Sequence, residues 1–349
     1  MKRILSIALT LAMALSLTAC GGSSNSGSNG GSSDANSKGD GEAAASYQWT
    51  AANAQTTNGP WDLALLEFAR LLDEKSGGAI TLTVYSGGQM GSEKEGIEGV
   101  QMGNIDFAIC STASLSSFTD TNAVWDLPYL VTNIEEGRKA ISSDAAQGLL
   151  DSLSNVSIKG LSYWENGIYA IGSTTPIRSM ADVQGMRIRA IDSALQADVY
   201  SSFGANPVVL AWGDIYTSIQ QGVIDAISST TIVNMHNSNF EEVAPYITTT
   251  NHGYSPAPLL MSQTLWDSLP SDIQAIVQEA ADEAQAFEFQ KMDEALSSCQ
   301  EAMESAGAEF IDVDLTEWVN AVAPIYDKYV GEGGVDADLV AQLQEAAKA

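Results

Sequence analysis

Apolar positions after residue 49 recur with two alternating spacings. In residues 61–72 they return every three or four positions, which predicts a helix that Gly77 helps to end. Residues 80–85 alternate apolar and polar side chains as a strand does, and residues 105–110 form another apolar, strand-like run. Between these strands, residues 92–102 begin with the pattern of a capping box and predict a second helix. This strand–helix–strand order favours a parallel sheet with right-handed crossovers.

The rest of the chain repeats the alternation and contains one long helical segment. Residues 271–306 include no Gly or Pro and consist mostly of good helix formers. At 1.5 Å per residue this helix would extend about 50 Å, which is longer than one lobe. We therefore predict two α/β lobes bridged by this helix. Further strands are predicted at 156–164, 168–172, 186–190, 207–210, 223–227 and 259–262, and further helices at 192–203 and 214–220.

The N-terminus has the pattern of an export signal. Lys2 and Arg3 precede an apolar run at residues 4–17, which is too short to span a bilayer. The run ends in Leu-Thr-Ala-Cys at Cys20, which resembles the lipobox of bacterial lipoproteins. The resemblance implies a lipoprotein signal peptide at residues 1–19, cleavage before Cys20 and a lipid on its thiol. The alternative is a plain secretory peptide with a chance cysteine.

The segment that follows has the composition of a tether. Gly, Ser and Asn occupy 17 of the 21 positions in residues 21–41, too polar a composition to bury a core. We expect residues 20–46 to be a flexible, lipid-anchored linker. The folded part would then be extracytoplasmic and held at the cell membrane, either in a periplasm or on an outer face.

The charge balance excludes several classes of partner. The chain has 349 residues, with 15 Lys+Arg against 44 Asp+Glu and a formal net charge of -29. So acidic a surface repels phosphate backbones, which argues against nucleic acid, and it also disfavours docking of protein patches on anionic lipid. Three Cys, with no Cys-x-x-Cys pair, and two His predict no metal site. Beyond Cys20, we favour buried free thiols for Cys110 and Cys299 over a disulfide between them.

Sequence motifs for catalysis are absent. The chain has no nucleophile elbow, no phosphate-binding loop, no dinucleotide fingerprint and no His-Glu-x-x-His helix. We expect His236 and His252 to be structural, hydrogen-bonded histidines. The prediction is therefore no catalytic residue, no cofactor and no enzyme. The alternative from another class is an extracellular hydrolase that uses paired carboxylates, which a count of Asp and Glu cannot identify.

Positive charge is scarce in the middle of the chain. From residue 160 to 290 the cations are Arg178, Arg187 and Arg189. Arg187 and Arg189 lie two residues apart, so in a strand they share a face. Arginine suits the binding of a carboxylate because its planar fork donates two parallel hydrogen bonds. Taken alone, the Arg-x-Arg pair is more typical of surface ion pairs.

The arginines belong to a longer pattern. Asp182–Arg189 resembles the Asp-x-x-Gly-x-Lys-Ile-Arg motif of solute-binding proteins of TRAP (tripartite ATP-independent periplasmic) transporters. The resemblance covers about residues 49–349 and implies a two-lobe, periplasmic-binding-protein-like clamshell. Lobe I would comprise 47–172 plus about 255–296, and lobe II 173–254 plus about 297–349. Other matching segments are 77–78, 88–91, 98–106, 127–129, 203–207, 212–225, 250–252 and 266–270.

The resemblance also implies which residues line the cleft. Arg189 matches the arginine that binds the ligand carboxylate in these proteins. Asp192 falls where a ligand-contacting Asn often lies, and Trp212 falls where an aromatic residue lines the cleft. Asn53 and Ser111 fall at loop ends of the first lobe that line the cleft.

Departures from the family pattern bear on the ligand. Positions that are often cationic or amide-bearing in the family are Tyr169, Thr175 and Ser229 here. Tyr169 and Trp164 add aromatic surface, although packing inside the lobe is the alternative for Trp164. We therefore expect a small monocarboxylate, such as a keto, hydroxy or aromatic acid, contacted by these residues and Ser229.

The expected partners follow from the family. A TRAP solute-binding protein delivers its small organic acid to the membrane permease subunits of the transporter, and we expect this one to act as a monomer. The alternative within the same fold is a sensor lipoprotein that passes ligand occupancy to a membrane kinase.

Overall fold

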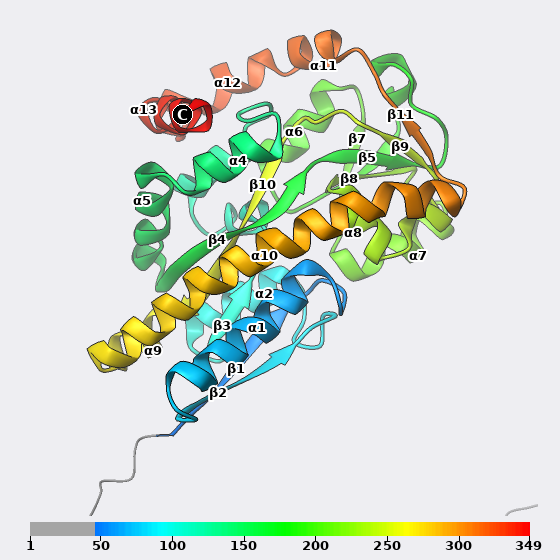
Figure 1. Ribbon diagram of the computed structural model, residues 1–349. Helices are drawn as coiled ribbons and strands as arrows, with labels where there is room; N and C mark the ends of the chain where they lie inside the picture. The colour runs from blue at the N-terminus through cyan, green and yellow to red at the C-terminus, as the bar shows by residue number, and fades with distance from the viewer. Residues whose placement is uncertain (1–45) are drawn as a thin grey trace, which may run out of the picture. The chain divides into compact units, whose positions relative to one another are not determined.

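The computed structural model describes residues 46–349, apart from the side chains of Ser229 and Thr230, and contains two β-sheets with helices packed on them (Figure 1). The α-helices are α1 (Pro60–Lys75), α2 (Glu93–Met102), α3 (Thr112–Leu115), α4 (Ile134–Ile141), α5 (Asp144–Ser152), α6 (Ala194–Ser202), α7 (Ile215–Gln220), α8 (Ile232–Asn237), α9 (Gln263–Ser268), α10 (Ser271–Ser305), α11 (Leu315–Ala321), α12 (Ala323–Tyr329) and α13 (Ala337–Lys348). The 3₁₀ helices are η1 (Asp120–Asp126), η2 (Leu153–Val156), η3 (Met180–Val183), η4 (Trp212–Asp214), η5 (Phe240–Glu242) and η6 (Gly331–Gly333).

The N-terminal predictions fall on residues 1–45, outside the part that the structure describes. They are the signal peptide at 1–19, the lipid on Cys20 and nearly all of the linker at 20–46. Within residues 46–349, no helix is both long and apolar enough to cross a membrane.

The first sheet has five strands and is mixed. β1 pairs in parallel with β2 and β3, as the strand–helix–strand pattern predicts, while β10 is antiparallel to β3 and β4. The strand predicted to end at residue 164 continues to Ile168, because β10 pairs with it along its whole length. The strand order is β2 (Ile80–Tyr85), β1 (Tyr47–Asn53), β3 (Phe107–Ile109), β10 (Tyr254–Ser262) and β4 (Ile158–Ile168).

The second sheet has six strands. β6 is parallel to both β7 and β8, and β5 is antiparallel to β8 and β9. Parallel strands end at the same edge of a sheet, so the carboxyl ends of β6 and β7 lie together. The strand order is β11 (Glu309–Ile311), β9 (Tyr246–Thr248), β5 (Ala170–Ser173), β8 (Ala226–Thr230), β6 (Arg187–Ala190) and β7 (Asn206–Val209).

The chain passes between the sheets at three places. Tyr169 alone separates β4 from β5, and residues 249–253 separate β9 from β10. The third connection is α10, the helix predicted at 271–306, which contacts α1 and β4 along one part and α8 along another (Figure 1). The buried residues of α10 likewise fall into two groups along the helix. Ala280 and Ala284 lie in the core with α1, whereas Met292 and Cys299 pack with Val233 of α8.

Local sequence explains where the helices near the site begin. Pro60 lies in the first turn of α1, where a missing backbone N–H costs nothing, and Trp61, Leu65, Phe68 and Leu72 make its buried face. Helix α2 begins at the capping box predicted from the sequence, in which the Ser92 hydroxyl accepts from Glu95 N–H. It ends at Gly103, whose φ of 74° places it in the left-handed region that favours glycine.

The C-terminal helices contact helices that pack on each of the two sheets. Trp318 of α11 packs against Phe203 after α6, with ring centroids 4.8 Å apart. The Tyr326 hydroxyl donates to the Pro128 carbonyl, and α13 packs on α4 and α5. The lobe boundaries given above stay a prediction. Cys110 and Cys299 are both buried and are free thiols, as favoured from the sequence.

Candidate ligand-binding site

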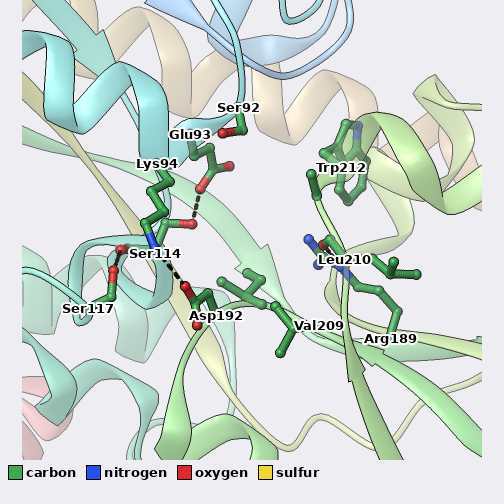
Figure 2. Close-up of a pocket in the computed structure, with 12 residues that line it drawn as sticks. Ser92, Glu93, Lys94, Ser114, Ser117, Arg189, Asp192, Val209, Leu210 and Trp212 are labelled. Atoms are coloured by element: carbon green, nitrogen blue, oxygen red, sulfur yellow. Dashed lines mark hydrogen bonds and ion pairs between the residues drawn. The ribbon is translucent and has the colours of Figure 1, made fainter.

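A pocket of about 190 Å³ lies at the carboxyl ends of β6 and β7 and faces the start of α2 (Figure 2). The second sheet contributes Arg189 and the segments just after β6 and β7, while α2 and α3 contribute the polar wall opposite them. Ligands in α/β folds bind at this kind of position, in the crevice beyond the carboxyl ends of strands. The lining residues are Ser92, Glu93, Lys94, Ser114, Ser117, Arg189, Ile191, Asp192, Val209, Leu210, Ala211 and Trp212.

Arg189 is a buried cation with spare hydrogen-bonding capacity. Its side chain comes from β6 and is only 4% exposed. Nε donates to the Leu210 carbonyl at 3.1 Å, whereas Nη1 is buried without a hydrogen-bond partner. Among residues 46–349, no carboxylate oxygen lies within 4.0 Å of this guanidinium. Burial lowers the pKa of Arg189, against the opposing charge of Glu93, but an arginine stays protonated in proteins. The guanidinium is therefore equipped to bind an anion.

An aromatic ring lies beside this cation. The Arg189 guanidinium carbon is 5.7 Å from the centroid of the Trp212 ring, within the range of a cation–π interaction. Trp212 begins η4, three residues after the end of β7, and packs on Phe240, with ring centroids 5.1 Å apart. Figure 2 shows the indole on the same side of the pocket as the guanidinium, above Leu210. Trp212 and Leu210 give the pocket an apolar side next to its positive charge.

The opposite wall is built around Glu93, the first residue of α2. Its Oε2 accepts hydrogen bonds from the Ser111 backbone N–H at 3.0 Å, the Ser111 hydroxyl at 2.7 Å and the Ser114 hydroxyl at 2.6 Å. Three donors hold this oxygen in place, and the structure records no bond to Oε1 within the described residues. The carboxylate can therefore accept a hydrogen bond from a hydroxyl group of a ligand.

A charged pair joins the two walls. Lys94 Nζ lies 3.1 Å from Asp192 Oδ2, and both side chains are more than half exposed (Figure 2). Exposed pairs of this kind contribute little to stability because water and salt screen them. The pair connects α2 to the residues just after β6, so it lies across the pocket that Arg189 and Glu93 line.

Arg187 shows what an arginine outside the pocket does in the same strand. It binds Asp225 through both Nε, at 2.9 Å, and Nη2, at 2.6 Å. Its side chain is 45% exposed. Arg187 forms a surface ion pair, which was the alternative to ligand binding for the Arg-x-Arg pattern. Arg189 is buried and has no such partner among the described residues.

Three of the residues predicted to contact the ligand line this pocket, namely Arg189, Asp192 and Trp212. Ser229 lies in β8, but its side chain is outside the described residues. Ser111 does not line the pocket, because its hydroxyl caps α3 and donates to the carboxylate of Glu93.

The other three predicted contacts are engaged elsewhere. Asn53 ends β1, where its Nδ2 donates to Ser86 at 3.1 Å and its Oδ1 accepts from Gln55 N–H. Trp164 is fully buried in the core between the first sheet and α10, as its packing alternative proposed. Tyr169 is 3% exposed and its hydroxyl accepts from Gln196 Nε2. As ligand contacts, these three stay predictions.

Sequence reasoning did not select Glu93, Lys94 and Ser114. The sequence did carry one signal for them, since the Ser92 capping box places Glu93 and Lys94 in the first turn of a helix that follows a parallel strand. Such helices begin at the carboxyl edge of a sheet, where ligands bind.

The fold and the pocket together define a class. Two sheets covered by helices, with a pocket at the carboxyl edge of one of them, match the fold of periplasmic solute-binding proteins. The family described as bacterial extracellular solute-binding protein, family 7, matches residues 51–332, and the chain belongs to this family. The family and the fold class expected from the sequence are thereby confirmed. Proteins of this family are extracytoplasmic binding components of transport systems rather than enzymes.

Individual relatives are similar along most of their length. The C4-dicarboxylate-binding protein DctB of Bacillus subtilis is 29% identical over 83% of this chain and 84% of its own. A TRAP periplasmic solute-binding protein from Xanthobacter autotrophicus, solved with bound β-D-galacturonate, is 27% identical with a TM-score of 0.82, covering 86% of this chain and 100% of its own. A TRAP periplasmic solute-binding protein from Pseudomonas putida, solved with bound D-glucuronate, is 29% identical with a TM-score of 0.81. The match covers 86% of this chain and 97% of that protein.

Proposed function

We propose that this TRAP solute-binding protein captures a sugar acid with a single carboxylate and delivers it to the membrane permease of its transporter. The observation that carries the proposal is the Arg189 guanidinium, which is buried in the pocket while Nη1 lacks a partner. A buried donor without a partner is costly, and a ligand carboxylate would supply the missing acceptor. Arg189 would thus fix the acid group of the ligand.

The remaining lining favours hydroxyl groups over a second acid group. Glu93 offers a carboxylate oxygen, which accepts from hydroxyl groups and repels another carboxylate. The second cation of the pocket, Lys94, is already paired with Asp192. Trp212 provides a flat apolar surface for the C–H face of a sugar ring. A polyhydroxy acid satisfies all of these groups at once, and the similar proteins that were solved with galacturonate and glucuronate support this class.

Capture would depend on the two lobes. The pocket is lined from both sides, so closure of the lobes around the acid excludes water and strengthens its ion pair with Arg189. The proposal includes the earlier expectations for residues 1–46, namely export, a lipid on Cys20 and a tether that keeps a monomeric binding protein near its permease.

A panel of matched acids and neutral analogues tests the proposed ligand class. The protein from residue 44 onward, which contains all described secondary structure, is heated with galacturonate, glucuronate, gluconate, succinate, galactose and glucose. A ligand at a hundredfold excess over its Kd stabilises the native state by about 2.7 kcal/mol. We expect a large rise in Tm with one or more sugar acids and none with the neutral sugar of the same ring. An equal rise with galactose, or a rise with succinate alone, would contradict the proposal.

A further inference from the structure

Asp126, the last residue of η1, has a buried carboxyl group held entirely by neutral donors. The residue is 6% exposed. Its Oδ2 accepts from the Ser193 hydroxyl at 2.7 Å and the Ser116 hydroxyl at 3.1 Å, and its Oδ1 accepts from Gln196 Nε2 at 3.3 Å. Within residues 46–349, no Lys, Arg or His nitrogen lies within 4.0 Å of it. Asp126 is therefore a buried acid without a cation.

Two of its three donors come from the opposite side of the pocket. Ser193 is the N-cap of α6 and Gln196 lies in its first turn. This helix begins two residues after Asp192, and Arg189, Ile191 and Asp192 just before it line the pocket. Asp126 precedes β4 and belongs to the predicted lobe I, whereas α6 belongs to the predicted lobe II. The three hydrogen bonds thus include a polar contact between the lobes beside the ligand site.

Of the ionisable side chains Asp126, Tyr169 and His252, Asp126 is the one whose pKa lies in the weakly acidic range. Burial raises the pKa of Asp126 to about 6 from the ordinary 3.8, against the effect of its three hydrogen bonds. Tyr169, which shares Gln196 with it, has a pKa raised by burial and by the charge of Asp126, so it stays neutral. The His252 ring lies 5.5 Å from the Tyr169 ring, and burial lowers the pKa of His252 to about 3.

Several other ionisable side chains lie on the elements that contact η1. Helices α3, α5 and α6 and strand β10 contact η1, and α3 has no ionisable side chain. On α6, Asp198 is held by Lys328 and Tyr329. The ionisable residues of these elements are Asp144, Asp151, Asp198, Tyr200 and Tyr254, and the Tyr200 hydroxyl donates to Gln196 Oε1 at 3.0 Å. Within the described residues, no hydrogen bond or ion pair joins Asp126 to Asp144, Asp151, Asp198 or Tyr254.

We propose that Asp126 is a positioning residue that couples ligand capture to the uptake of one proton. The inference rests on the proposed function, because it requires that the lobes part when the pocket is empty and expose Asp126 to water. Closure around a sugar acid moves the carboxyl group from water into the enclosure formed by Ser116, Ser193 and Gln196. The proton passes from the solvent to the Asp126 carboxylate, and no bond in the ligand changes.

The direction of the pH effect follows from linkage. A closed state that binds a proton more tightly than the open state must bind its ligand more tightly when that proton is present. With a pKa of 3.8 in the open state and about 6 in the closed state, the Kd should fall about tenfold from pH 7.5 to pH 5.0. The same values give an uptake of about 0.7 proton per ligand at pH 5.5 and almost none at pH 7.5.

Titration calorimetry measures this uptake directly. D-galacturonate and D-glucuronate are titrated into the protein from residue 44 onward at pH 5.5 and at pH 7.5, in buffers with different enthalpies of ionisation. The variant Asp126→Asn removes the titrating group but keeps the size of the side chain. The control is Asp120→Asn, which changes an exposed acid at the other end of the same 3₁₀ helix. We expect proton uptake at pH 5.5 in wild type and in the control, and none in Asp126→Asn.

The possible results separate this inference from the proposed function. Binding with the same proton uptake in Asp126→Asn as in wild type would overturn the inference alone. No binding heat with any sugar acid at either pH would overturn the proposed function and this inference with it. If Asp126→Asn does not fold, Ser193→Ala provides the test. Loss of the 2.7 Å hydrogen bond should raise the pH midpoint of the affinity above that of wild type, and an unchanged midpoint would overturn the inference.

Discussion

Replacing His252 with glutamine should make the free energy of unfolding less sensitive to acid. His252 is 2% exposed and lies among the rings of Tyr169, Tyr200 and Phe203. Its Nδ1 shares a hydrogen bond of 2.7 Å with the Thr250 hydroxyl. Burial disfavours the charged ring and lowers its pKa to about 3, so the folded protein holds a neutral histidine far below the ordinary pKa of 6.5.

The size of the effect follows from proton binding in the unfolded chain. At pH 5.0 an unfolded histidine with a pKa of 6.5 is almost fully protonated, while the folded one stays neutral. The unfolded state binds more protons, so stability is full above pH 6.5 and falls as the pH drops towards 3. Between pH 7.5 and pH 5.0 this loss amounts to about 2 kcal/mol. Glu165, whose pKa burial raises to about 6, acts in the opposite sense.

Urea denaturation of wild type and His252→Gln at several pH values isolates the histidine. The titration of Glu165 is common to both proteins and cancels in the difference between them. We expect wild type to be the more stable protein at pH 7.5, and its advantage to shrink by about 2 kcal/mol at pH 5.0. A difference in stability that stays constant across this range would show that His252 is protonated without cost in the folded state, and would refute the reasoning.

Three further substitutions test the packing and the buried charge on α4 and α5. Gly137→Ala should cost about 1–3 kcal/mol, because its Cβ would lie 2.5 Å from atoms of the Tyr254 ring. The matched Gly148→Ala on α5 meets no atom within 4 Å and should stabilise by about 0.5–1 kcal/mol, so equal changes in Tm would contradict the packing. Arg138→Met removes the cation 2.7 Å from the fully buried Glu165 and should cost about 3–5 kcal/mol at pH 8. That cost should be smaller at pH 5, where Glu165 is neutral, and a cost independent of pH in urea denaturation would count against this pairing.

The sequence predicted the features of the fold that depend on local patterns. The capping box at Ser92 and the uninterrupted helix formers after residue 271 determine structure within a few turns, so both helices begin where expected. The course of β4 through residue 165 was not predicted. Its length depends on pairing with β10, which lies about ninety residues further along the chain.

The candidate site was predictable only in part, because many of its side-chain contacts join segments that lie far apart in the sequence. Family motifs predict that Asn53, Ser111 and Tyr169 contact the ligand, but the hydrogen-bond partners of their side chains come from distant segments. Asn53 bonds to Ser86, Ser111 to Glu93 and Tyr169 to Gln196. Arg189 was identified because it falls at the last position of the family motif at Asp182–Arg189, and a match to that motif does not depend on contacts with distant segments.

Binding by two arginine variants tests the central claim, that Arg189 holds the carboxylate of the ligand. Arg189→Ala and Arg187→Ala remove the same side chain from positions two residues apart in β6, one in the pocket and one on the surface. Calorimetry with the sugar acid that gives the largest thermal shift should show a loss of about 2–5 kcal/mol for Arg189→Ala. Arg187→Ala should bind as wild type does. Equal affinities for wild type and Arg189→Ala, with both proteins folded, would contradict the account.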